Sequence, residues 1–270
     1  MSFFRPLNKP ANPALPPATP AYSTLYHDKF NSILRLFFNQ IQNVFDNLLG
    51  PNGGQYIDCP HGVFFNTQDQ IYAANDTAYP VEFDSTYLSN GVALEAVTVT
   101  AGAFVVGVRY TIVSVGSTNF TLIGAASNTV GVVFVATGVG TGTGTASTKS
   151  RIRASVNGLY NFQYTGQVYT STGNKVEVAL WIARNGTDIS YSTRINTIAS
   201  NNHYFEILWN FDIDLAAGEY IELKTSIDDH APNIRLDAFA AVAPYPAGAS
   251  SVLTVNFIAP LPDPRPTLPP

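Results

Sequence analysis

Side chains that commonly perform catalysis are scarce in this sequence, and one candidate combines a thiol with an imidazole. Cys59-Pro60-His61 places these two groups two residues apart, a pairing found in nucleophilic and metal sites. Neighbours this close do not readily adopt the separated, oriented geometry of a Cys–His pair. Cys59 is also the sole cysteine, so no multi-cysteine zinc shell can form. We therefore expect a structural role for this segment.

Carboxylates form the other candidates. Asp228 and Asp229 stand beside His230 in an expected loop, but two oxygen ligands fall short of the roughly six to eight that Ca²⁺ takes. A solvated loop that caps one end of the fold is the favoured interpretation, and metal binding there stays open. Asp212 and Asp214 face the same side of an expected strand. Glycoside hydrolysis would need paired carboxylates in a cleft, which this spacing does not predict.

Signature motifs of common enzymes are also missing. The sequence contains no GxSxG, HExxH, P-loop or Rossmann fingerprint. The Gly-Thr repeat at 138–145 is too regular, and followed by too little helix, to hold a phosphate group. We predict a protein that is not an enzyme, with no catalytic residue, no cofactor and no bound metal.

Composition excludes further classes. Charged residues make up 12% of the 270 positions, about half of the usual share in a soluble domain. The net charge of −5 argues against nucleic-acid binding, which requires a basic face. No segment reaches the roughly 18 uninterrupted apolar residues of a membrane span, so we expect no membrane insertion. A surface with so few charges is common in proteins that function inside an assembly.

Prolines divide the chain into a body and two arms. They cluster in residues 1–20 and 260–270 and are absent from 81–231. Since proline cannot donate to a β-ladder, we expect a β body between a Pro-rich extended arm (1–27) and a Pro-rich tail (259–270). The arm is either disordered or an anchor that becomes ordered on a partner, at low entropic cost because proline pre-sets φ.

One segment, residues 28–50, predicts a helix, with Asp28 as the N-cap and Gly50-Pro51 as the stop. Its apolar residues alternate in steps of four and three and form one continuous stripe, wider than a two-stranded seam needs. The helix either folds back on its own β domain or forms a parallel bundle with neighbouring chains, most simply three. In the second case the trimer interface is formed by Phe30, Leu34, Phe37, Ile41, Val44 and Leu48.

The remaining sequence predicts a mainly β protein. Turn signals separate short alternating or apolar runs, and Asn185-Gly186 is the clearest hairpin turn because it supplies the positive φ angles of type I′. We expect an antiparallel jelly-roll sandwich over residues 51–95 and 149–258. The segment 96–148 carries a single charge, Arg109, and is either a flexible linker or a small inserted β subdomain that packs on its parent or a neighbour.

Aromatic residues suggest two different roles. Trp181 and Trp209 stand mid-strand among apolar neighbours, so we expect both in the core. Tyr169, Tyr191 and Tyr204 lie near turns, where aromatic rings with a polar tip can contact carbohydrate or protein.

Parts of the sequence resemble the jelly-roll domains of tailed-phage virion proteins, which are similar to the tumour-necrosis-factor fold. The resemblance is carried by residues 72–84 (YAANDTAYPVEFD), 89–94, 158–164, 180–188, 209–211 and 215–223. The run 107–121, with the Gly-Thr repeats, is similar to a mobile β module of phage structural proteins.

The resemblance implies a homotrimer in the virion, assembled in the host cytoplasm, that serves as capsid decoration, cement or head fibre. The N-terminal arm would contact the major capsid protein or tail proteins. The alternative is a tail-fibre or baseplate protein that recognises a host surface glycan.

Overall fold

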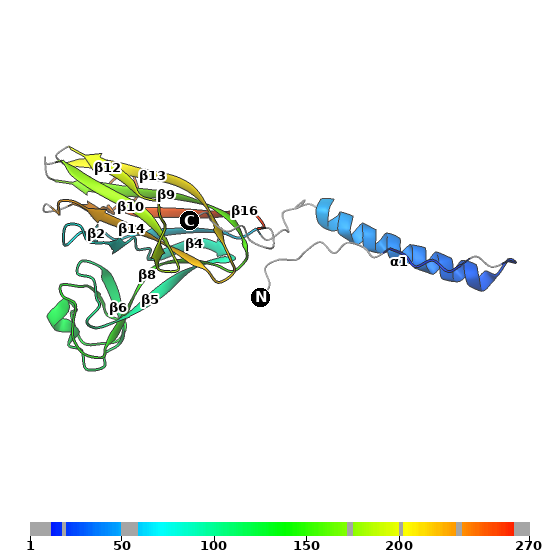
Figure 1. Ribbon diagram of the computed structural model, residues 1–270, viewed down its shortest axis with the longest axis horizontal. Coiled ribbons are helices and arrows are strands. Elements are labelled where there is room, and N and C mark those ends of the chain that lie inside the picture. Colours follow the sequence, from blue (N-terminus) through cyan, green and yellow to red (C-terminus); the bar gives the residue numbers. More distant parts are fainter. Residues whose placement is uncertain are drawn as a thin grey trace. The chain divides into compact units, whose positions relative to one another are not determined.

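The protein is mainly β with one N-terminal helix and antiparallel sheets, which confirms the predicted fold class (Figure 1). The computed structural model describes residues 12–17, 20–49, 59–171, 175–199, 202–230 and 234–261, with the side chains of 46–49 outside this description. Two compact units divide the chain, Met1–Cys59 and Pro60–Pro270. Residues 1–11 and 18–19 of the Pro-rich arm and residues 262–270 of the tail lie outside the described residues.

Helix α1 spans Thr24–Leu49. It begins before the predicted start because Ser23, and not Asp28, is the N-cap. The Tyr26 N–H donates to the Ser23 hydroxyl at 3.3 Å, and the His27 N–H donates to the Ser23 carbonyl at 3.2 Å. A serine hydroxyl that accepts from the third helical N–H satisfies a donor that has no partner within the helix. The prediction of Asp28 as the cap was therefore wrong.

The first sheet contains seven strands in the order β2–β15–β9–β16–β1–β4, with β13 on the other edge of β9. The bounds are β1 His61–Asn66, β2 Gln70–Ile71, β4 Ser85–Asn90, β9 Gly158–Thr170, β13 His203–Leu215, β15 Arg235–Leu236 and β16 Ser251–Ala259.

The second sheet contains nine strands in the order β11–β10–β14–β8–β6–β7, with β12 paired to β10, β3 to β14 and β5 to β8. The bounds are β3 Tyr79–Pro80, β5 Val92–Thr100, β6 Arg109–Ser114, β7 Val133–Val135, β8 Thr145–Ala154, β10 Val176–Arg184, β11 Thr187–Asp188, β12 Arg194–Ile198 and β14 Tyr220–Ile227. The jelly-roll connectivity within this arrangement stays a prediction.

The core lies between the inner faces of the two sheets. Burial alternates along β9, where Tyr160, Phe162 and Tyr164 point inward. These rings belong to one continuous cluster with residues of the second sheet, such as Leu180 and Ile221. Alternation with period two therefore leaves one face of each sheet for the core and the other for the surface.

An inserted module lies between β5 and β8. These two strands pair with each other from Val92 opposite Ala154 to Thr100 opposite Thr145. Residues 101–144, within the predicted module of 96–148, connect these two strands. The module contains β6, β7 and the short helix η1 (Phe120–Ile123). Phe104, Tyr110, Phe120 and Phe134 form an aromatic cluster with ring centroids 5.0–6.1 Å apart.

The Gly-Thr repeat packs tightly within this module. The Gly144 N–H donates to the Thr118 hydroxyl at 2.9 Å, and the Thr143 N–H donates to the Ser117 hydroxyl at 3.1 Å. A Cβ at Gly144 would lie 2.5 Å from the Val115 carbonyl oxygen. Glycine is therefore required there by close backbone approach, and the repeat is part of a folded subdomain and not a flexible linker.

Candidate functional site

Three of the carboxylates singled out in the sequence, Asp212, Asp214 and Asp228, have structural partners. The Asp228 carboxylate accepts from the Glu177 N–H at 2.7 Å, and Asp214 forms an ion pair with Arg184 at 2.8 Å. Asp212 accepts from the Asn161 amide at 2.7 Å across the first sheet. Cys59 is exposed. Within the described residues, no three His, Cys, Asp or Glu side chains gather as metal ligands.

The apolar stripe of α1 has no buried member among its described side chains. Phe30, Leu34, Phe37, Ile41 and Val44 are all half-buried, and Leu48 lies outside the described side chains. Leu36, Phe38 and Phe45 beside the stripe are more than half exposed. No described helix combines the length and the hydropathy needed to cross a membrane.

A surface groove of about 420 Å³ lies on the outer face of the second sheet. Its lining combines a small floor residue, two aromatic rings, a carboxylate and two hydroxyls, from Ala179, Trp181, Asp188, Ile189, Ser190, Tyr191 and Thr193. Strand β10 supplies the floor, and the segment that follows β11 supplies the rim.

Trp181 reaches this groove because of the alternation along β10. Leu180 and Ile182 point into the core, so the tryptophan between them points outward and is half-buried. Trp209 is buried. The prediction that both tryptophans lie in the core was therefore right for Trp209 and wrong for Trp181. An apolar run along the sequence does not reveal which face each ring occupies.

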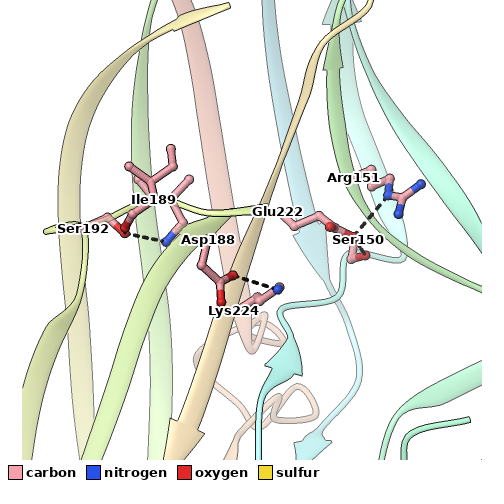
Figure 2. A network of polar contacts seen from close by, with 8 residues as sticks. Ser150, Arg151, Asp188, Ile189, Ser192, Glu222 and Lys224 are labelled. Carbon is pink, nitrogen blue, oxygen red and sulfur yellow. Dashed lines mark hydrogen bonds and ion pairs between the residues drawn. The ribbon is translucent and has the colours of Figure 1, made fainter. Parts of the chain in front are cut away.

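Asp188 is held in the groove by an ion pair with Lys224 (Figure 2). The Lys224 ammonium donates to its carboxylate at 2.8 Å, and Lys224 lies directly across from Trp181 in the β10–β14 register. The bond from Lys224 is the largest cause of the lowered pKa of Asp188, and a bond from the Trp181 indole adds to it. The carboxylate therefore stays ionised as an acceptor at neutral pH.

Two hydrogen bonds of the Ser192 hydroxyl fix the segment that forms the rim of the groove (Figure 2). Its hydroxyl accepts from the Ile182 N–H at 3.2 Å and donates to the Ile189 carbonyl at 2.8 Å. The preceding Tyr191 is 98% exposed and has a φ of 64°. A bulky residue in the left-handed region is strained, so the brace holds the phenol ring out into solvent.

The other two turn tyrosines lie on the first sheet and do not share this groove. Tyr169 and Tyr204 face each other across the β9–β13 pair, with ring centroids 4.9 Å apart. The Arg235 guanidinium stacks on Tyr169 at 4.7 Å. The three predicted surface tyrosines therefore do not form one rim, and Tyr191 instead lines the groove that Trp181 also lines.

A second cavity, of about 320 Å³, lies where the inserted module meets the rest of the β unit. It is lined by four charged side chains together with polar and apolar neighbours: Asn66, Gln68, Glu82, Phe83, Asp84, Arg109, Thr111, Val133, Ser147, Thr148 and Lys149. Burial raises the pKa of Glu82 to about 7, against the opposing effects of the Arg109 N–H and guanidinium. Nothing in the local sequence distinguishes this glutamate from a surface residue.

No protein-family model matches the chain, and no curated protein matches it.

The ion pair in the groove gives a direct prediction. In Lys224→Met, the pKa of Asp188 should rise toward its ordinary value of 3.8, because the carboxylate loses its nearest cation. NMR titration of the Asp188 carboxyl carbon measures this. Lys175→Met is the matched control, since Lys175 pairs with Glu177 at 2.9 Å and should leave Asp188 unaffected. An unchanged Asp188 titration in Lys224→Met would contradict the assigned pairing.

Proposed function

We propose that this chain is a non-enzymatic structural protein of a phage virion. In this proposal it forms a homotrimer that decorates or cements the capsid, or forms a head fibre, and is anchored by its N-terminal arm. The observation that carries the proposal is the apolar stripe of α1, none of whose described side chains is buried. The assignment to a virion rests on the resemblance of the separate stretches between residues 72 and 223 to tailed-phage proteins.

The stripe supports association with copies of the same chain. Burial of each large apolar side chain contributes about 1.5–3 kcal/mol, so completing the burial of a long stripe that is only half-buried favours association. The steps of four and three residues suit parallel packing of identical helices. Exposed Leu36, Phe38 and Phe45 widen the apolar surface beyond what a single partner helix covers, which favours three chains over two.

The inserted module supports a place inside an assembly. Its only charge is Arg109. The module also exposes Leu122, Val130, Val133 and Val139, each by more than half. An exposed aliphatic surface with almost no charge favours contact with another protein surface. In the proposed particle, the module packs against sister chains or a neighbouring virion protein.

The groove favours a second candidate, a tail-fibre or baseplate protein that binds a host surface glycan. Trp181 and Tyr191 offer aromatic surfaces to the apolar faces of a sugar ring. Ionised Asp188 accepts hydrogen bonds from sugar hydroxyls, and Ser190 and Thr193 add neutral donors and acceptors. Small Ala179 leaves the floor beside the indole open. Aromatic and hydrogen-bonding groups thus converge on a preformed site.

A charged residue introduced into the apolar stripe of α1 tests self-association. Ile41→Asp should convert a trimer into monomers, because the bundle would bury three carboxylates close together. Sedimentation equilibrium of the full chain measures the mass. Asn39→Asp, on the exposed opposite side of α1, should leave the trimer intact. A wild-type monomer, or an Ile41→Asp variant that remains trimeric, would contradict the role of the stripe.

Location on a particle is tested by electron microscopy with gold-labelled antibodies against the β unit. The structural proposal predicts labels over the heads of the phage particles that encode this chain. Labels confined to the tail would favour the receptor-binding candidate. Particles without any label would refute both virion roles.

Glycan binding is tested with an array of bacterial surface polysaccharides. If the groove binds sugar, Trp181→Ala and Tyr191→Ala should each weaken binding about tenfold or more, as expected for loss of a central aromatic contact. Tyr204→Ala is the control, because Tyr204 is also exposed but lies on the other sheet. Binding that survives both groove changes would exclude this site.

A further inference from the structure

Glu82 joins the inserted module to the rest of the β unit. It lies in the segment between β3 and β4, and its carboxylate accepts from the backbone N–H of Arg109, the first residue of β6, at 2.9 Å. Only 7% of the residue is exposed. This carboxyl group therefore provides a buried polar contact across the junction.

The backbone of Glu82 is fixed on the side away from the module. Its N–H donates to the Gln70 side-chain oxygen at 2.7 Å. Its carbonyl accepts from the Asn66 amide at 3.0 Å and from the Gln70 amide at 3.2 Å. With the main chain held at three points, the movable partners of the carboxyl group are those on the module.

The surroundings compensate a negative charge on Glu82 only in part. A hydrogen bond with the Thr148 side chain and the Arg109 contacts favour the ionised form, while Asp84 disfavours it. Lys149 lines the adjoining cavity but is itself exposed. The remaining titratable groups are phenols: Tyr110 on β6, and Tyr72 and Tyr79, which line a small gap on the far side of Glu82.

The adjoining cavity contains two further polar atoms that are poorly satisfied. Asp84 Oδ1 and Arg109 Nε are buried and have no hydrogen-bond partner among the described residues. Asp84 is otherwise tied through Oδ2 to the Thr67 N–H and hydroxyl, at 3.1 and 2.6 Å. The charges at this junction are thus not fully paired with one another, and the cavity beside Glu82 offers water a route to its carboxyl group.

Near Glu82, Gly107 and Val108 are buried where the module meets the rest of the β unit. Gly107, at a φ of 95°, approaches the backbone of Ile71 and Ala73 without a side chain of its own. Strand β6 pairs with β8 only from Thr111 onward. Displacement of the stretch 105–110 from Glu82 would leave the β6–β8 ladder intact, but it would move β7, which pairs with Arg109 and Tyr110, and it would expose Val108.

We propose that Glu82 is a protonation-controlled lock: with a proton on its carboxyl group the stretch 105–110 stays closed against the β unit, and loss of that proton loosens it. The direction of the pH dependence follows from the linkage between proton binding and closure. A carboxyl group whose pKa is about 7 when buried and 4.5 when hydrated binds its proton more tightly in the closed form. Closure is therefore most stable below pH 4.5, weakens as the pH rises, and is weakest above about 7.

The size of the effect follows from the same two values. A difference between 4.5 and about 7 changes the ratio of open to closed forms by up to about 300-fold between acidic and basic pH. Since this lock acts within one chain, it is independent of whether the protein is a virion component and of what the groove binds.

Hydrogen exchange of the full chain, followed by mass spectrometry, tests the lock. At pH 5.5 and 8.5, after correction for intrinsic exchange, peptides covering 104–114 should open at least tenfold more at the higher pH. Peptides covering β9 (158–170) serve as the internal reference and should change little. Glu82→Gln, which retains an acceptor for the Arg109 N–H but cannot ionise, should remove the pH dependence at 104–114.

Glu95→Gln is the matched control, because Glu95 pairs with Arg153 away from this cavity and its loss should leave the pH dependence intact. Equal changes at 104–114 and 158–170 would indicate loss of global stability and overturn the lock. A pH dependence that persists in Glu82→Gln would do the same. If that variant does not fold, NMR titration of Glu82 in the wild-type chain decides, since a midpoint near 4.5 excludes the mechanism.

Discussion

The two-sided pairing of β9 is the constraint on which the β unit depends. Its 13 residues pair with β13 over the whole length on one edge, and with β16 and β15 on the other. Because side chains alternate along a strand, this fixed register decides which residues of four strands face the core. Tyr160, Phe162 and Tyr164 fill the core, while Asn161 and Gln163 face outward.

The same alternation builds the surface features of the second sheet. Leu180 and Ile182 are buried, so Trp181 is placed outward, where it meets Lys224 across the strand pair and Asp188 from the following hairpin. The groove is therefore a consequence of core packing combined with a short braced turn. Its aromatic and acidic groups come from β10, from β11 and from the segment that follows β11, and they gather only when the register is formed.

These relations show what could be predicted from the sequence. Period-two patterns and Asn185-Gly186 were sufficient for strands and a hairpin, since both signals are local. The helix was predicted from its stripe, but its start was misplaced, because Ser23 and Asp28 are both good capping residues and only the backbone geometry distinguishes them. Trp181 and Glu82 escaped prediction because their environments are made by residues distant in sequence, such as Lys224 and Arg109.

Low charge has different consequences in different parts of the chain. In α1 it leaves an apolar stripe without repulsion between identical helices. In the inserted module it leaves aliphatic side chains exposed around a small aromatic core. At the junction between this module and the rest of the β unit, the carboxyl group of Glu82 is instead buried. Desolvation there raises its pKa, so its protonation state changes near neutral pH. A chain with few charges thus concentrates its electrostatic effects at the few places where charged groups meet, and Glu82 beside Arg109 is one of the deeply buried ones.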